Sequence, residues 1–181
     1  MGRHRCVPAN NYADVRLRFR DAKLDDVPAM AALHNSTAGA LTARFGHGPW
    51  SALSNERGAE LSLRNARVRV GVLERRLVTM LRLAPKKPWA IDVKYFTPAA
   101  RPVYLTGMAV AVQHQRAGLG RRALEDAAVV ARAWPADAIR LDAYDGAGGA
   151  GAFYAHCGYA PRGRAVFKGT SLLYYELVLD A

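Results

Sequence analysis

The sequence has few cysteines and no long hydrophobic run. Its 181 residues include two cysteines, Cys6 and Cys157, which are too few for the disulfide framework of a small secreted domain. No apolar stretch approaches the roughly 20 residues that are needed to cross a membrane. Residues 1–11 carry charge but no apolar segment follows them, so they do not resemble a secretory signal. We therefore expect a protein of the reducing cytoplasm, without a membrane anchor.

Acidic residues are also scarce. The chain has 15 Asp and Glu against 26 Lys and Arg, a formal net charge of +11. Such a balance is one mark of nucleic-acid-binding proteins. Here the basic residues are spread along the chain and no nucleic-acid-binding motif accompanies them, so local attraction of an anionic ligand is the favoured interpretation. The histidines and cysteines lack the spacing of metal ligands, and we expect no metal site.

Length and a 51% share of hydrophobic residues are sufficient for one domain with its own core. We assign residues 1–14 to a flexible N-terminal extension and residues 15–181 to a single domain. The hydrophobic patterns predict strands over Val15–Phe19, Arg67–Leu73, Leu77–Ala84, Tyr104–Val112, Ala138–Tyr144, around Val166 and over Leu172–Leu179, with Trp89–Pro98 as a further extended segment. They predict helices over Leu24–Asn35, Ala59–Asn65, Gly120–Trp134 and Gly149–Cys157, and a short, interrupted helix within residues 36–56. This order indicates a mixed α/β fold with one β-α-β crossover.

Residues 115–120 read Gln-Arg-Ala-Gly-Leu-Gly and lie between an expected strand and an expected helix. In such a turn, glycine lets the backbone approach a phosphate closely, and the free N–H groups of the first helical turn point toward it. Arg121 and Arg122 follow in that first turn, where the positive end of the helix dipole disfavours cations unless an anion binds there. The loop is therefore predicted to bind a pyrophosphate.

The spacing of the loop narrows the choice of ligand. A Walker loop ends in Gly-Lys-Ser/Thr, which residues 120–122 do not provide, and the dinucleotide fingerprint requires three glycines. The loop instead resembles the Gln/Arg-x-x-Gly-x-Gly/Ala pattern of the GNAT acyltransferase superfamily. Residues 150–159, Ala-Gly-Ala-Phe-Tyr-Ala-His-Cys-Gly-Tyr, resemble a second segment of that family at the expected distance. The resemblance covers residues 100–178, and the first strand and helix more weakly.

The resemblance implies a GNAT fold, a mixed β-sheet that is splayed at its centre and flanked by helices. It also implies that acetyl-CoA binds in the gap and donates its acetyl group to a small-molecule or peptide amine; a homodimer stays open. The implied cofactor-binding residues are Met108, Ala109 and Val110 for the pantetheine, and Gln115, Arg116, Ala117, Gly118, Leu119, Gly120 and Arg121 for the pyrophosphate.

Two residues are candidates for the chemistry. Tyr154 matches the family tyrosine that protonates the departing thiolate; the alternative is a core aromatic beside Phe153. Asp142 stands where relatives that acetylate ribosomal proteins carry a glutamate base. Strand alternation places Asp142 on one face with Arg140 and Tyr144, so the alternative is an ion pair between Asp142 and Arg140 or a residue of a neighbouring strand.

The acceptor side is less clearly marked. Tyr104 and Thr106 share a face of the central strand, and Asn35 and Ser36 follow the first expected helix; these four are candidates for the acceptor groove. Cys157 is expected to be a small core residue, which favours direct transfer in a ternary complex over a cysteine nucleophile. Two alternative functions stay open, a non-catalytic acyl-CoA-binding regulatory module and, less favoured, a basic nucleic-acid-binding protein.

Overall fold

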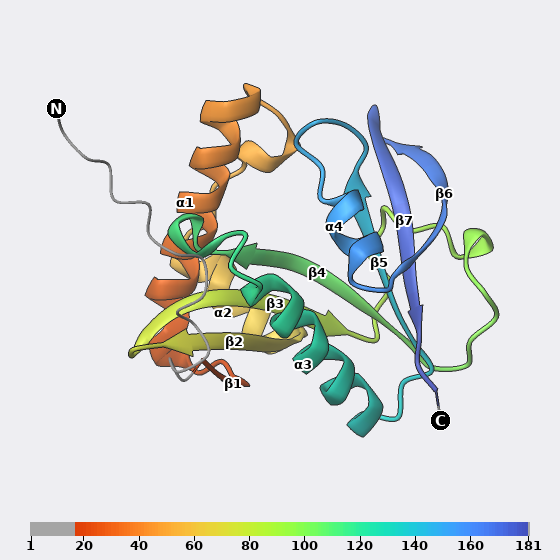
Figure 1. Ribbon diagram of the computed structural model, residues 1–181, viewed down its shortest axis with the longest axis horizontal. Coiled ribbons are helices and arrows are strands. Elements are labelled where there is room, and N and C mark those ends of the chain that lie inside the picture. The colour runs from red at the N-terminus through yellow and green to blue at the C-terminus, as the bar shows by residue number, and fades with distance from the viewer. Residues whose placement is uncertain (1–16, 181) are drawn as a thin grey trace, which may run out of the picture.

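The structure is a computed structural model that describes residues 17–180, so the expected extension over residues 1–14 lies outside the described residues (Figure 1). The strands are β1 (Arg18–Asp21), β2 (Arg67–Leu73), β3 (Arg76–Ala84), β4 (Pro102–Val110), β5 (Ala138–Tyr144), β6 (Ala160–Phe167) and β7 (Thr170–Val178). The helices are α1 (Val27–Phe45), α2 (Glu56–Asn65), α3 (Leu119–Ala133) and α4 (Gly151–His156), with the 3-10 turns η1 (Leu24–Asp26), η2 (Pro49–Ser51), η3 (Val93–Tyr95) and η4 (Val112–His114).

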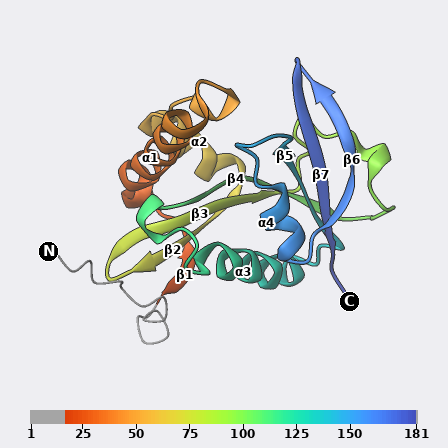
Figure 2. The same ribbon diagram turned by 45° about the horizontal axis from the view of Figure 1, so that its top comes forward.

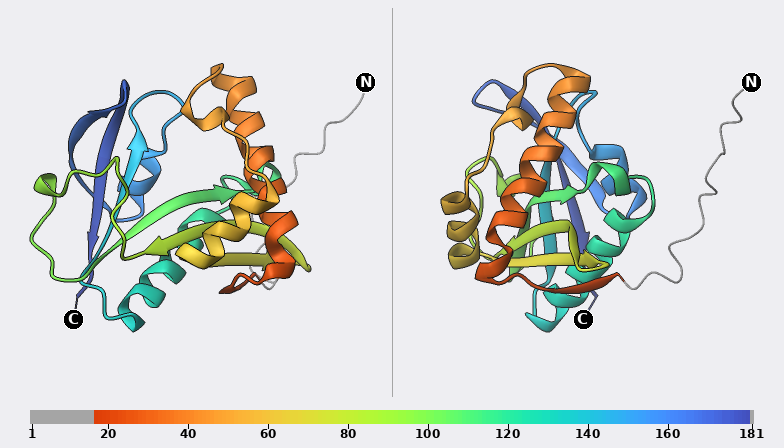
Figure 3. Two further views of the ribbon diagram at one scale, coloured as in Figure 1. Left: turned by 180° about the vertical axis from the view of Figure 1, so that it is seen from behind. Right: turned by 90° about the vertical axis from the view of Figure 1, so that its left-hand side faces the viewer.

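One mixed sheet organises the described chain. The strand order is β1-β2-β3-β4-β5-β7-β6, and β4 with β5 is the one parallel pair of neighbours in it. Helices α1 and α2 cover one face of the sheet and α3 covers the other (Figure 2 and Figure 3). The predicted class, a mixed α/β fold with a central β-α-β crossover, is therefore confirmed.

Two apolar clusters hold the helices on the sheet. Small residues on α3 let this helix approach β4 and β5 closely, and with their neighbours they form the first cluster: Ala123, Leu124, Ala127, Ala131, Leu105, Ile139 and Leu141. On the opposite face, Met30 and Leu33 of α1 pack with Val68 and Val70 of β2. Because side chains alternate across each strand, one strand supplies both layers.

The sheet is splayed between β4 and β5. The two strands pair over only three positions, Pro102–Tyr104 with Ala138–Arg140. Beyond that point β4 continues along β3, while β5 continues along β7 to its end at Tyr144. Figure 1 shows the two strands diverging from a common end. The divergence leaves a V-shaped opening in the sheet, as the family resemblance implied.

An irregularity in β4 accompanies this divergence. The register of β4 against β3 shifts between Met80 and Arg82, and Gly107 in the middle of β4 has a φ of +58°, a left-handed value that favours glycine. Such a bulge bends a strand and increases its local twist. The bend turns the second half of β4 away from β5 and toward α1.

Several expected elements differ from the structure. Helix α1 begins at Val27 and runs on to Phe45, ten residues past the expected end, because Gly39 is exposed and tolerated inside it. The first strand is Arg18–Asp21 rather than Val15–Phe19, and residues 15 and 16 lie outside the described part. Residues 89–98 contain the 3-10 turn η3 and no strand. Strand β6 is longer than the expected segment around Val166.

Candidate active site

A cavity of about 330 Å³ occupies the opening between β4 and β5. Strand β4 contributes Leu105, Thr106, Gly107 and Met108 to its lining, and β5 contributes Asp142, Ala143 and Tyr144. Tyr154 of α4 and part of α1 complete the wall. The fold therefore brings the two predicted chemical residues, Asp142 and Tyr154, to one cavity.

Tyr154 lines this cavity and is buried, with 7% of its surface exposed. Its hydroxyl donates to the sulfur of Met108 at 3.8 Å, the weak type of hydrogen bond that sulfur accepts. Burial raises the pKa of the phenol well above its ordinary value of 10.0, and the nearby Asp142 carboxylate raises it further. The phenol consequently keeps its proton at neutral pH, as a proton donor must. Its ring also packs on Tyr159 and Tyr175, so the aromatic-core interpretation and the chemical one are both compatible with its position.

Asp142 projects from β5 into the same cavity. Burial raises the pKa of its carboxyl group above the ordinary value of 3.8, and its own backbone N–H partly offsets this. Within residues 17–180, no Lys, Arg or His side chain forms an ion pair with Asp142. The carboxylate is therefore accessible and more basic than an ordinary aspartate.

The alternative that paired Asp142 with Arg140 is wrong. Arg140 is buried and donates instead to Glu176 of β7 at 2.9 Å, and its guanidinium lies over the ring of Phe96. Arg162 also pairs with Glu176, at 2.8 Å, and the Thr97 hydroxyl donates to it at 2.7 Å. Glu176 therefore engages Arg140, and this explains why Arg140 does not pair with Asp142.

Two aromatic residues, Trp50 and Tyr144, form part of the cavity wall. Trp50, from η2, packs edge-on against Tyr144 at 5.8 Å and against Phe45 at 6.3 Å. A Cβ atom on Gly148 would lie 3.0 Å from the Trp50 ring, and one on Gly149 would overlap the Tyr144 carbonyl oxygen. The glycine-rich segment after β5 is thus packed closely against its own neighbours.

Residues 115–118 precede α3, and Leu119 and Gly120 are its first two residues, so the segment lies at the start of a helix as predicted. Gly118 has a φ of +80° and caps the helix in a left-handed conformation, with no atom within 4 Å of the position of a Cβ atom. The first intrahelical hydrogen bond runs from Arg122 N–H to the Gly118 carbonyl oxygen. The N–H groups of residues 119–121 therefore have no acceptor within the helix. Arg116, Arg121 and Arg122 are exposed around this turn.

The loop is connected to the opening between the strands. Ala111 N–H donates to the Val78 carbonyl oxygen of β3 at 2.8 Å. In an antiparallel pair, successive residues direct their backbone N–H and C=O groups alternately toward the partner strand and away from it. The N–H and C=O groups of Val110 therefore point away from β3, toward β5. The Val110 carbonyl oxygen accepts from the Gln115 side chain. A Cβ atom on Gly120 would lie 3.0 Å from the Phe153 ring, so glycine lets α3 approach α4 here. The polar edge of β4 thus leads directly to the helix terminus.

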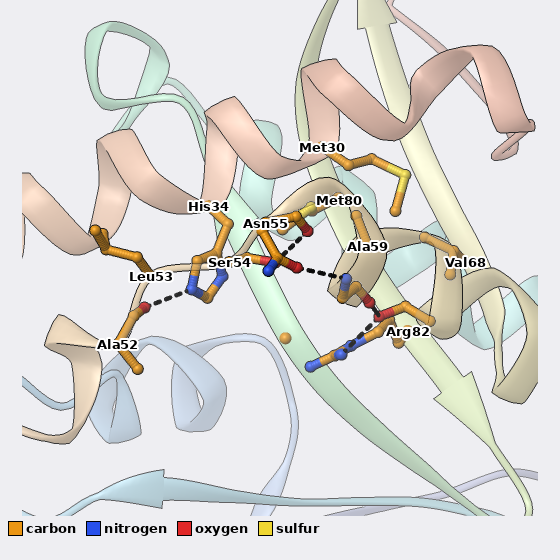
Figure 4. A pocket seen from close by; sticks show the side chains of 13 residues that line it. Met30, His34, Ala52, Leu53, Ser54, Asn55, Ala59, Val68, Met80 and Arg82 are labelled. Atoms are coloured by element: carbon orange, nitrogen blue, oxygen red, sulfur yellow. Dashed lines mark hydrogen bonds between the residues drawn. The ribbon is translucent and has the colours of Figure 1, made fainter.

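A second cavity, of about 380 Å³, lies between α1, α2 and the strands β2 to β4. His34, Ala52 and Gly107 line both cavities, so the two adjoin. The carbonyl oxygen of Ala52 can only accept, so His34 donates to it from Nε2, at 2.9 Å. Figure 4 shows the Arg82 side chain extending from β3 into this cavity, with His34 and Leu53 toward its other end.

The structure places the four candidates for the acceptor groove in different surroundings. Thr106 lines the first cavity, whereas Tyr104 is buried in a separate cluster with Ile91 and Tyr174. Asn35 and Ser36 line neither cavity. Asn35 has a supporting position, because it exchanges two hydrogen bonds with Ser54, at 2.8 and 2.9 Å, and so fixes the segment between α1 and α2.

Cys157 is half-buried next to the first cluster, as expected for a small core residue. Burial raises the pKa of its thiol above the ordinary value of 9.0. A protonated thiol is a poor nucleophile. Among residues 17–180, no three His, Cys, Asp or Glu side chains come together as a metal site requires.

Sequence reasoning missed the residues from the N-terminal half, above all His34, Trp50 and Arg82. They come from a helix, a loop and a distant strand, and no motif connects them. The one signal in the sequence was Arg82 itself, a charged residue within a strand of mostly apolar residues.

The sequence of the chain matches the family model described as "Acetyltransferase (GNAT) family" over residues 32–159. No curated protein sequence matches it. No helix of the described chain is long and apolar enough to cross a membrane.

Solved structures share the fold at low sequence identity. A GNAT-family acetyltransferase from Streptococcus agalactiae is 17% identical with a TM-score of 0.72, covering 91% of this chain and 96% of that one. The ribosomal-protein-alanine N-acetyltransferase from Brucella melitensis is 20% identical with a TM-score of 0.68, covering 90% and 100%. The protein yncA from Salmonella typhimurium, solved with its cofactor acetyl-CoA, is 18% identical with a TM-score of 0.65, covering 91% and 94%.

The unpaired carboxylate generates a stability prediction. Because folding raises the pKa of Asp142, its contribution to stability is complete below the ordinary value of 3.8 and is lost as the pH rises through the folded pKa. Asp142→Asn should therefore raise Tm near pH 7, and the gain should disappear toward pH 3, in thermal melts across that range.

Asp126→Asn is the opposite control, because the Asp126 carboxylate accepts two hydrogen bonds from Arg69, at 2.8 and 2.9 Å. The loss of this ion pair should lower Tm at neutral pH. If both variants lowered Tm near pH 7, the description of Asp142 as an unpaired, half-buried carboxylate would be wrong.

Proposed function

Because the chain belongs to the GNAT acetyltransferase family, we propose that it transfers an acetyl group from acetyl-CoA to a primary amine by direct transfer in a ternary complex. The observation that carries this proposal is the shared cavity of Asp142 and Tyr154, a raised-pKa carboxylate and a protonated phenol, in the opening between β4 and β5. The family uses acetyl-CoA, and the similar structure of yncA was solved with it.

The residues around the α3 terminus fit the cofactor that the family implies. A pyrophosphate needs unpaired N–H groups, a close approach of the backbone and positive charge. The first turn of α3 offers the N–H groups of residues 119–121, Gly118 leaves open space, and Arg116 and Arg121 are exposed beside it. Val110 presents polar backbone groups to the opening, where an extended amide-bearing arm can pair with them as a further strand does.

Asp142 and Tyr154 each have the chemistry for one proton transfer in the reaction. When bound, acetyl-CoA supplies a thioester carbonyl that an amine can attack. Asp142 accepts a proton from the acceptor ammonium, directly or through a water, which makes the nitrogen a nucleophile. Tyr154 donates its hydroxyl proton to the sulfur that leaves, and the second proton, which the nitrogen loses as the amide forms, restores the phenol. The raised pKa of both groups suits these opposite roles, since one must take a proton and the other must still hold one.

The rival function, a regulatory module that binds acyl-CoA without catalysis, needs the loop but neither chemical residue. The buried phenol and the unpaired carboxylate in one cavity favour catalysis, because an unpaired carboxylate whose pKa is raised by folding destabilises the fold at neutral pH. Turnover of acetyl-CoA in the presence of amines separates the two functions.

Substitutions at Gly118 test the cofactor loop. Gly118→Asp and Gly118→Asn add the same volume and require the same φ of +80°, which both residues tolerate better than most. They differ in charge, so only Gly118→Asp should repel a pyrophosphate. We expect calorimetry to show at least about 10-fold weaker acetyl-CoA binding for Gly118→Asp than for Gly118→Asn. Equal affinities in two folded variants would place the pyrophosphate elsewhere.

Tyr154→Phe tests the proton donor. Removing the hydroxyl leaves the ring packing in place, so turnover should fall about 100-fold while the KM for acetyl-CoA changes little. Tyr159→Phe is a matched control, since the Tyr159 hydroxyl is buried without a partner among residues 17–180 and its loss should not reduce turnover. Near wild-type turnover of Tyr154→Phe, with an acceptor for which chemistry limits the rate, would remove Tyr154 from the mechanism.

Asp142→Asn tests the proton acceptor in the same assay. A carboxylate base gives the pH–rate profile an acidic limb, where activity rises as the carboxyl group loses its proton. In Asp142→Asn that limb should shift or disappear, with lower turnover at neutral pH. An unchanged profile would assign the role to another group.

A further inference from the structure

Arg82 of β3 has no acidic partner. Its Nη1 donates to the Ser62 hydroxyl at 3.0 Å. Within residues 17–180 this is the one hydrogen bond of the Arg82 side chain, and the side chain forms no ion pair there. Burial lowers the pKa of its guanidinium, with no carboxylate to raise it. Arg20 and Arg69, by contrast, each have a carboxylate that raises their pKa. A guanidinium has five N–H donors and stays charged, so most of the donors of Arg82 are unused.

The backbone of β4 is shaped to receive this guanidinium. A Cβ atom on Gly107 would lie within 2.4 to 2.7 Å of Nη2, Nε and Cζ of Arg82. Gly107 also has the left-handed φ of +58°. No other residue type could stand there without displacing the arginine, so the bulge in β4 and the position of Arg82 form one feature.

The lining of the surrounding cavity contains no carboxylate. Ser54, Asn55, Ser62 and His34 are its polar members beside Arg82, and Met30, Leu53, Ala59, Val68 and Met80 give it an apolar side. A half-buried positive charge among neutral donors and apolar groups attracts an anion, because the low dielectric strengthens the attraction. The planar fork of arginine matches a carboxylate through two parallel hydrogen bonds.

The position of this cavity relates it to the chemistry. It adjoins the cavity of Asp142 and Tyr154 through His34, Ala52 and Gly107. A molecule with an anionic group at Arg82 can therefore extend past Gly107 into the opening between β4 and β5. The two cavities, about 380 and 330 Å³, are of the size that small molecules occupy.

We propose that Arg82 binds a carboxylate of the acceptor, so that the acetylated substrate is a small amine with a free carboxylate, such as an amino acid. This inference rests on the proposed function. In the reaction, the amine nitrogen forms a bond to the acetyl carbon, the carbon–sulfur bond breaks, the amine loses a proton and the thiolate gains one. The carboxylate is unchanged and serves to hold the amine in place.

The test compares each acid with its own amide. We would measure initial rates with acetyl-CoA and a panel of L-amino acids, each paired with its C-terminal amide. Without its carboxylate, the α-amine loses its proton more readily, so reactivity alone favours the amide. The proposal predicts the reverse for the preferred acceptor, a kcat/KM about 10 to 100-fold higher for the acid.

Substitutions then assign the preference to Arg82. Arg82→Gln should lower kcat/KM for the acid about 10 to 100-fold, mainly through KM, and leave the amide unaffected, while Arg82→Lys should retain part of the preference. Arg76→Gln is the matched control, since it removes the same charge from an exposed position of the same strand. If Arg82→Gln does not fold, the comparison of acids and amides with the wild-type protein still decides.

Three results would overturn the proposal: equal rates for acids and amides, a preference for acids that survives in folded Arg82→Gln, or acetylation of amines without a carboxylate while no acid reacts. Calorimetric measurement of acetyl-CoA binding separates a failure of the carboxylate subsite from a failure of the proposed function. If acetyl-CoA binds but no acid is acetylated or bound in the presence of coenzyme A, the carboxylate subsite alone is wrong. If acetyl-CoA does not bind, the proposed function is wrong and this inference falls with it.

Discussion

The early parting of β4 from β5 is the constraint on which the rest of the structure depends. Neighbouring strands normally satisfy each other's backbone groups along their length, and here they do so over only three positions. Past that point β4 turns polar groups of Val110 toward the opening, and β5 exposes Asp142 to the same space. The bulge at Gly107 bends β4, and β7 keeps β5 straight by pairing with all seven of its residues.

The charged residues around the opening are arranged so that Asp142 and Arg82 have no charged partner. Arg140, the neighbour of Asp142 on the same strand face, is fully engaged by Glu176 and Phe96. Arg82, on the other side of Gly107, is held by one serine. A structural network would pair such groups with each other. Their separation leaves one unpaired carboxylate and one unpaired guanidinium in adjoining cavities, which is an arrangement suited to an acceptor with an amine and a carboxylate.

The sequence predicted the fold class, most elements and the region of the site, because these depend on local signals. The loop over residues 115–120 and the segment around Tyr154 carry their own glycine and aromatic spacing, and the strands carry alternation. Tertiary contacts decided what the sequence could not: whether Arg140 pairs with Asp142 depends on Glu176, which lies 36 residues away. Likewise, the sequence predicted a helix that ends at Asn35, yet the packing of α1 on the sheet accompanies a helix that continues to Phe45.

The most direct test of the account is hydrogen exchange, measured by mass spectrometry with and without coenzyme A. If the cofactor lies in the opening and on the terminus of α3, it covers the backbone N–H groups of Val110 and of residues 119–121. The account predicts slower exchange in peptides over residues 108–122, and no change in β1 and β2 at the far edge of the sheet. Saturating coenzyme A that left exchange over residues 108–122 unchanged would contradict it.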